Sequence, residues 1–209
     1  MSINKDESWA VIKKLDTVKD YKECAHVYDE IFDTLSYSAP SHVARAVNEL
    51  LGNEKDALIL DAGAGTGLVG KELHDLGFTN LDALDGSQEM LNIANQKGVY
   101  KRTICDLLGT NRLDISNDTY SCVLVVGTIV PGHANASCLP ELFRITKPGG
   151  LVVITTRDVH VQGCGHAGKS LAEWMGIHEE NKLWRKMETR RVENYLDGHA
   201  GSIDIFQVV

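Results

Sequence analysis

A short apolar segment that ends in an aspartate and three alternating glycines constrains this 209-residue chain more than any other feature. Residues 58–67 read Leu-Ile-Leu-Asp-Ala-Gly-Ala-Gly-Thr-Gly. The apolar residues predict a buried parallel strand, and glycines directly after it allow a tight turn and the close approach of a ligand to the backbone. The segment from Leu68 to Leu76 then has helical spacing and stops at Gly77. The glycines therefore lead into a helix N-terminus, which favours anionic ligand groups.

The spacing of these glycines distinguishes two classes of cofactor. A dinucleotide-binding loop follows G-x-G-x-x-G, but after Gly63 and Gly65 this chain has Leu68 where that pattern needs its third glycine. Asp61, at the end of the strand, would repel a pyrophosphate and would suit a ligand with a cationic amino group and a sulfonium. The residues therefore favour S-adenosylmethionine, and a nicotinamide dinucleotide is the weaker alternative.

Here the chain resembles the class I S-adenosylmethionine-dependent methyltransferases, whose first motif is an acidic residue followed by G-x-G-x-G. The residues that this motif covers are Asp61, Gly63, Ala64, Gly65 and Gly67. Four further motifs follow in the family's order, so the resemblance covers roughly residues 55–156. Within the family, short segments at 28–29, 157–158 and 195–199 are most similar to the Williams–Beuren region group of methyltransferase-like proteins.

The resemblance assigns the ribose and the adenine to two further aspartates. Asp85 ends the apolar segment 81–85 where the family has an acidic residue that binds both ribose hydroxyls, as a carboxylate can. Asp106 stands where the family binds the adenine amino group. The other residues implied as cofactor contacts are Gly86, Ser87, Met90 and Leu107. Ser87 is also the expected cap of the helix that follows.

Two residues are candidates for catalysis. His133 follows the predicted strand 120–127, where the family often has a substrate contact, and a solvent-exposed loop histidine is the alternative. Tyr28 lies in a segment similar to one whose tyrosine folds over the donor pocket in the family; otherwise it is an apolar contact of an amphipathic helix. A sulfonium activates its own methyl group, so the protein has mainly to align the reacting atoms and exclude water. A general base is therefore optional.

The order of predicted elements indicates one α/β domain with small additions. Strands and helices alternate through the middle of the chain, and turn residues at 197–201 between two extended segments predict a hairpin. We therefore expect a Rossmann-like, seven-stranded mixed sheet with helices on both faces and an antiparallel C-terminal hairpin, as the resemblance implies. Residues 1–38 should form a helical lid and residues 39–209 the methyltransferase domain, with 156–209 supplying a helix and the closing hairpin. Ser41 is the expected cap of the domain's first helix.

Charge and cysteine content narrow the expected partners and location. Lys and Arg number 21 against 29 Asp and Glu, so the formal net charge is −8 and disfavours nucleic acid and acidic membranes as partners. We expect a small-molecule acceptor; a protein acceptor, or a regulatory S-adenosylmethionine-binding protein without turnover, is the alternative. Five scattered cysteines and a polar N-terminus predict a cytoplasmic protein. No apolar stretch approaches the roughly 20 residues of a membrane helix.

Two patterns in the last third of the chain suggest other chemistry. Residues 163–170 satisfy the phosphate-binding pattern G-x-x-x-x-G-K-S. No downstream apolar strand ends in a magnesium-binding aspartate, so nucleotide hydrolysis is not expected. His160, Cys164 and His166 lack a fourth ligand and match no structural zinc spacing, so we expect no metal site there.

Overall fold

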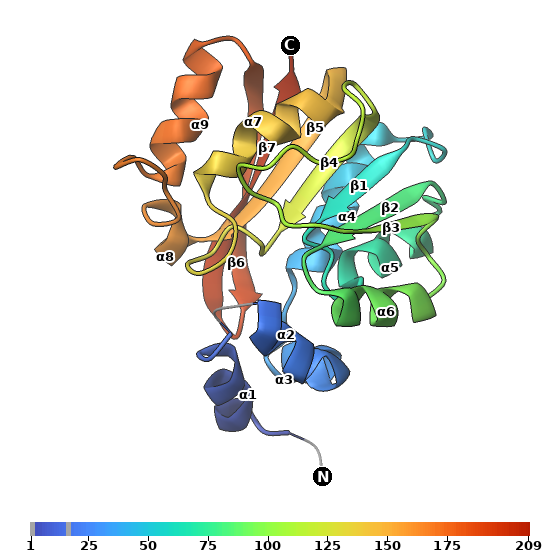
Figure 1. Cartoon of the computed structure of the whole chain (residues 1–209), viewed down its shortest axis with the longest axis vertical. Helices are drawn as coiled ribbons and strands as arrows, with labels where there is room; N and C mark the ends of the chain where they lie inside the picture. The colour runs from blue at the N-terminus through green and yellow to red at the C-terminus, as the bar shows by residue number, and fades with distance from the viewer. Residues whose placement is uncertain (1–2, 16–17) are drawn as a thin grey trace.

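The computed structural model describes residues 3–15 and 18–209 and places seven strands in one sheet (Figure 1). The strand order is β3-β2-β1-β4-β5-β7-β6, in which β1 to β5 run parallel and β7 is antiparallel to both of its neighbours. The strands are β1 (Ile59–Ala62), β2 (Leu81–Asp85), β3 (Arg102–Cys105), β4 (Tyr120–Val126), β5 (Thr146–Arg157), β6 (Trp184–Leu196) and β7 (His199–Val208). The expected Rossmann-like mixed sheet with an antiparallel C-terminal hairpin is therefore confirmed.

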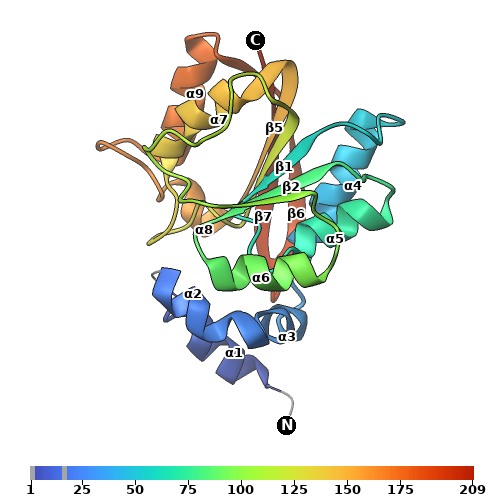
Figure 2. The same ribbon diagram turned by 45° about the vertical axis from the view of Figure 1, so that its right-hand side comes forward.

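Helices cover both faces of this sheet (Figures 1 and 2). One face carries α4 (Ala39–Leu51), α5 (Leu68–Asp75) and α6 (Gln88–Gln96), and the other carries η2 (Ala136–Cys138), α7 (Leu139–Ile145), α8 (Asp158–Val161) and α9 (Leu171–Glu180). The N-terminal segments gather at one end of the molecule, at the bottom of both views: α1 (Lys5–Ile12), α2 (Val18–Cys24), the 3₁₀ turn η1 (Ala25–Val27) and α3 (Tyr28–Thr34). Among the helices of the described residues, none has the length and apolar character needed to cross a membrane.

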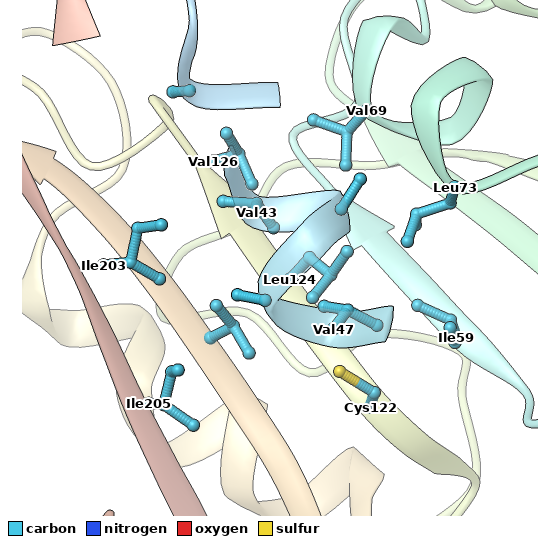
Figure 3. Packing of buried hydrophobic residues seen from close by; sticks show 14 of the residues in the cluster. Val43, Val47, Ile59, Val69, Leu73, Cys122, Leu124, Val126, Ile203 and Ile205 are labelled. Carbon is cyan, nitrogen blue, oxygen red and sulfur yellow. The ribbon is translucent and has the colours of Figure 1, made fainter. Parts of the chain in front are cut away.

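The central strands are apolar on both faces because helices cover both sides of the sheet. Figure 3 shows Val43 and Val47 of α4 pointing toward Leu124 of β4, and all three are fully buried. Val123 and Val125, which alternate with Leu124 along β4, belong to the core on the α7 and α9 face. The continuous apolar sequence of β4 thus fills two cores at once.

The first helix of the expected methyltransferase domain begins earlier than the sequence suggests. α4 starts at Ala39, so the prediction that Ser41 caps this helix is wrong. Ser41 lies within the first turn, where its hydroxyl donates to the Ser38 carbonyl over 3.0 Å. Pro40 also occupies this turn, where its missing N–H has no helical partner to lose.

The C-terminal hairpin anchors the N-terminal helix α1. Its turn is formed by Asp197 and Gly198, whose φ angles of 48° and 78° are typical of the tight turns that match the twist of a hairpin. The Asp197 carboxylate accepts hydrogen bonds from Lys5 Nζ (2.5 Å) and from the indole of Trp9 (2.8 Å). Residues from the two ends of the chain are therefore held together at this turn.

The core at α4 generates a stability prediction. Leu124→Ala should lower the free energy of unfolding by about 2–5 kcal/mol, because a fully buried leucine leaves a cavity between β4 and α4. Leu183→Ala removes the same atoms from a side chain that is 42% exposed and should cost less than about 1 kcal/mol. Chemical denaturation of both variants checks this, and equal losses would contradict the packing described.

Candidate functional site

The glycine loop, residues 63–67, joins β1 to α5 at the carboxyl edge of the parallel strands. The amides of Gly63 and Ala64 donate to the Leu84 carbonyl in β2 over 2.7 and 3.0 Å, which ties the loop to the neighbouring strand. The loop requires glycine at Gly63 for two reasons. Its φ is +85°, and a Cβ there would lie 2.1 Å from Thr128 Oγ1. The missing side chain therefore lets the loops after β1 and β4 touch.

Gly65 faces open space instead of a neighbouring loop. Its φ is +54°, and the nearest atom to a Cβ built there is Cε1 of Tyr28, at 4.0 Å. Tyr28 begins α3, and its ring packs against Phe32 with a centroid distance of 4.4 Å. The structure thus places Tyr28 above the glycine loop, while its role in catalysis stays a prediction. Burial raises the pKa of Tyr28 well above 10, so its phenol stays protonated and is unsuited to act as a base.

Asp85 joins the loops after β1 and β2. Its Oδ2 accepts from the Gly65 amide and its Oδ1 from the Ser87 amide, both over 2.8 Å. Each carboxylate oxygen can accept a second hydrogen bond, so the group retains the capacity to bind a vicinal diol. Burial raises the pKa of Asp85, and the two amide hydrogen bonds act in the opposite direction.

Asp61 lies behind the glycine loop. The side chain is 2% exposed, and its Oδ2 accepts from the Tyr100 hydroxyl over 2.6 Å. The same hydroxyl accepts from the Gly70 amide in α5 over 3.1 Å. Burial raises the pKa of Asp61 to about 7, an effect that the Tyr100 hydrogen bond partly offsets. The structure therefore gives Asp61 a buried position bonded to Tyr100, and its contact with a cationic ligand stays a prediction.

Sequence reasoning missed Tyr100 because no local pattern links it to a carboxylate 39 positions away. The only trace in the sequence is the presence of two glycines that make room for its ring. A Cβ at Gly67 would lie 2.9 Å from Cε2 of Tyr100, and a Cβ at Gly70 would lie 2.2 Å from its hydroxyl.

Ser87 and Met90 lie between the sheet edge and the N-terminal helices. The Ser87 hydroxyl accepts from the Met90 amide over 3.3 Å, so the expected cap of α6 is present. The Met90 side chain is 1% exposed and packs in a cluster with residues of the N-terminal segment. These residues are Leu15, Cys24 and Ala25. Met90 therefore helps attach the N-terminal helices to α6.

The loop after β3 carries the residues that the resemblance assigns to the adenine. Asp106 Oδ1 accepts from the Leu107 amide over 2.8 Å and from the Asn111 side chain over 3.2 Å. Leu107 is 57% exposed. The Gly86 carbonyl faces the Cys105 thiol at 3.9 Å, so the loops after β2 and β3 are adjacent. The positions assigned to ribose and adenine thus lie along one sheet edge, and their binding roles stay predictions.

His133 lies in the loop after β4 with an oriented ring. Its Nδ1 lies 3.0 Å from the Pro131 carbonyl oxygen, which can only accept, so Nδ1 carries the proton in the neutral ring. Its Nε2 therefore has a lone pair. This atom is buried and has no hydrogen-bond partner among residues 3–15 and 18–209. The ring meets Tyr21 of α2 edge-on at a centroid distance of 5.0 Å.

A three-residue latch connects the N-terminal helices to the glycine loop. Asp29 of α3 accepts from the Thr66 hydroxyl and, over 2.7 Å, from Lys97 Nζ at the end of α6. Lys97 Nζ also donates to the Thr66 carbonyl over 2.6 Å. These contacts hold α3 over the loop that bears Gly65. No sequence pattern suggested them, because the three residues come from separate segments.

The G-x-x-x-x-G-K-S pattern forms a tight turn closed by its own backbone. The amides of His166 and Lys169 bond to each other's carbonyl oxygens over 2.9 and 3.1 Å, so they are not available to a phosphate. The Ser170 hydroxyl accepts from the Glu173 amide as the cap of α9. Across the part of the chain that is described, no three His, Cys, Asp or Glu side chains form a group suited to hold a metal ion.

Comparisons with known proteins point to one family. A methyltransferase-domain family profile matches residues 59–150. Human methyltransferase-like protein 27 is 41% identical over 138 residues, which cover 66% of this chain and 56% of that protein. The demethylmenaquinone methyltransferase of Tropheryma whipplei is 27% identical over 136 residues, covering 65% of this chain and 56% of that protein. The chain thus spans about half the length of the curated relatives it matches.

One solved structure extends the similarity to nearly the whole fold. The 1,6-didemethyltoxoflavin-N1-methyltransferase of Burkholderia thailandensis, solved with 1,6-didemethyltoxoflavin and S-adenosylhomocysteine, aligns with a TM-score of 0.65 at 19% identity. The alignment covers 99% of this chain and 91% of that one. At this identity the likeness supports the fold.

Asp61 generates a pH prediction. Its pKa is about 7 in the folded chain against an ordinary 3.8, so the folded state binds an extra proton between about pH 4 and pH 7. Binding this extra proton stabilises the folded state at low pH, and that stabilisation is lost as the pH rises through this window. Asp61→Asn keeps an acceptor for Tyr100. It should remove this part of the pH dependence of the unfolding free energy, which amounts to at most about 4 kcal/mol.

Denaturation of both proteins between pH 4 and pH 8 measures the difference. A smaller decline should persist in the variant because burial also raises the pKa of Asp85. Identical pH profiles would show that Asp61 has an ordinary pKa.

Proposed function

We propose that the chain, which is similar to methyltransferases in sequence, is a class I S-adenosylmethionine-dependent methyltransferase that transfers a methyl group from S-adenosylmethionine to a small-molecule acceptor. The observation that carries the proposal is the open face of the glycine loop at Gly65, bounded by the Asp85 carboxylate and the Tyr28 ring. The finer resemblance, to the Williams–Beuren region group, fits the 41% identity with human methyltransferase-like protein 27.

The residues around the glycine loop fit this cofactor better than a dinucleotide. Asp85 can accept two further hydrogen bonds from a ribose diol. Asp61 is buried, Asp85 is partly buried, and the Asp85 charge helps to raise the pKa of Asp61, so a cationic ligand is favoured here and a pyrophosphate is not. When bound, S-adenosylmethionine supplies the methyl group on its sulfonium.

The protein's part in the reaction is to orient the acceptor and exclude water. Tyr28 covers the loop from α3, and Tyr21 packs against His133, so the N-terminal helices cover both the glycine loop and the loop after β4. The lone pair of His133 Nε2 is buried, so it can accept a proton from an acceptor hydroxyl or N–H group only when the surrounding side chains move. Tyr28, as a neutral phenol, contributes its ring and a hydrogen-bond donor.

A small acceptor is supported by this cover of helices and by the net charge of −8, which offers no broad basic surface to a nucleic acid. Two similar proteins are named for small acceptors, demethylmenaquinone and 1,6-didemethyltoxoflavin. We further propose that residues 1–38 act as a lid, since the Asp29 latch holds α3 on the glycine loop. The five free cysteines support a cytoplasmic location.

Asp85 provides the first test of the cofactor site. Asp85→Asn should weaken S-adenosylhomocysteine binding by about 10- to 150-fold, because one charged acceptor of the ribose is replaced by an amide. Asp82→Asn is the matched control, since Asp82 is a buried carboxyl of the same strand that bonds to Tyr120. Calorimetry should find that Asp82→Asn binds S-adenosylhomocysteine with an affinity within about twofold of the original protein. Unchanged affinity in Asp85→Asn would remove Asp85 from the site.

His133 provides the test of turnover. With acceptors drawn from a library of small phenols, enols and N-heterocycles, His133→Gln should lower kcat by about 10²- to 10⁴-fold. Its affinity for S-adenosylhomocysteine should stay within about twofold, because His133 has no assigned cofactor contact. If the unmodified protein binds the cofactor tightly but no library member is methylated, the regulatory alternative replaces the enzyme.

A further inference from the structure

A cavity of about 320 Å³ lies on the α7 and α9 face of the sheet, apart from the Gly65 face of the glycine loop. Its volume is at the lower end of the range of small-molecule sites. The wall is built from the loop 109–112, the residues that begin α7, and α9. The side chains that matter for its chemistry are Arg112, Glu141, His166, Trp174 and His178.

His178 is an unsatisfied polar group in the wall of this cavity. The residue is 7% exposed, and neither ring nitrogen has a hydrogen-bond partner within the described ranges 3–15 and 18–209. Burial lowers its pKa, so the ring is neutral at pH 7 and carries one donor and one acceptor. Both ring nitrogens are themselves buried, so a ligand in the cavity meets the exposed edge of the His178 ring and not its nitrogens.

The flat sides of the cavity come from aromatic rings. Trp174 stacks on His178 with a centroid distance of 5.5 Å and an interplanar angle of 28°. The Trp174 indole donates to the His166 carbonyl over 2.8 Å, which fixes its orientation. Phe143 meets His178 edge-on with a centroid distance of 4.9 Å. This arrangement suits a planar ligand of one or two rings.

The charge at the cavity is positive. Glu141 is neutralised, since its carboxylate binds Arg144 and accepts from the Leu113 amide over 2.7 Å. Arg112 has one hydrogen bond to the neutral Asn117 side chain, at 3.2 Å, and its guanidinium carries five donors. Arg112 therefore has donors for an anionic ligand group, and a carboxylate matches the guanidinium in geometry.

We propose that this cavity is a second binding site, for a small aromatic carboxylate whose ring lies against Trp174 and His178 and whose carboxylate binds Arg112. The site is separate from the methyl-donor site and does not depend on the proposed methyl transfer. The loop after β3 links the two sites, because Asn111 of the cavity wall donates a hydrogen bond to Asp106.

The first experiment titrates the full chain, saturated with S-adenosylhomocysteine, with indole-3-carboxylate and with 2-naphthoate. Saturation keeps the probes out of the donor site, and a parallel titration without S-adenosylhomocysteine makes the result independent of that site. At least one probe should bind with a dissociation constant of about 1 mM or tighter, as expected for ligands of about a dozen heavy atoms. It should shift the indole N–H resonance of Trp174.

The matching carboxamides should bind about tenfold more weakly, because they lack the charge that Arg112 recognises. Failure of both carboxylates to bind, or equal binding of acids and amides, would overturn the proposal.

Variants locate the site. Arg112→Gln should weaken the carboxylate at least about tenfold and abolish its advantage over the amide. His178→Phe keeps an aromatic ring in the wall and removes only buried nitrogens, so it should fold and bind the probe within about twofold of the original protein. Arg102→Gln, an exposed arginine on β3, is the control and should bind like the original protein. Binding unaffected by Arg112→Gln would place the probe elsewhere and overturn the proposal.

Discussion

The hydrogen bonds from the Gly65 and Ser87 amides to Asp85 are the interaction on which the site depends. They join the loop after β1 to the loop after β2, so one carboxylate sets the relative position of these two loops. The bond from the Gly65 amide to Asp85 also holds Gly65 at its positive φ angle, and the face that the glycine loop presents at Gly65 depends on that conformation. The loop after β4 can approach the glycine loop closely because Gly63 has no side chain that would collide with Thr128.

Two buried carboxyl groups in this small region represent a local cost to folding. Burial raises the pKa of Asp61 and of Asp85, which means that each charged form is disfavoured in the folded chain. Functional sites commonly retain such costs, because the ligand and not the protein supplies the compensating group. The Tyr100 hydroxyl relieves part of the cost at Asp61 through its hydrogen bond to the carboxylate.

Features encoded in contiguous residues could be predicted from the sequence, and features formed across the fold could not. The alternation of apolar strands, the glycines after β1 and the turn at Asp197 and Gly198 are local patterns, so the sheet and its closing hairpin were predictable. The partner of Asp61 lies in a segment before β3 that only tertiary packing brings near. The start of α4 was mistaken at Ser41 because Pro40, a frequent helix breaker, is equally stable in a first helical turn.

The latch formed by Asp29, Thr66 and Lys97 has a kinetic consequence. Tyr28 precedes Asp29 directly, so the ring that covers Gly65 moves only when these polar contacts break. Under the proposed lid role, exchange of spent donor for fresh donor would require a transient opening of α3, as in enzymes whose covering segments limit product release. The lifetime of the closed state, and not the reactivity of the acceptor, would then set the ceiling on how many cycles the protein completes each second.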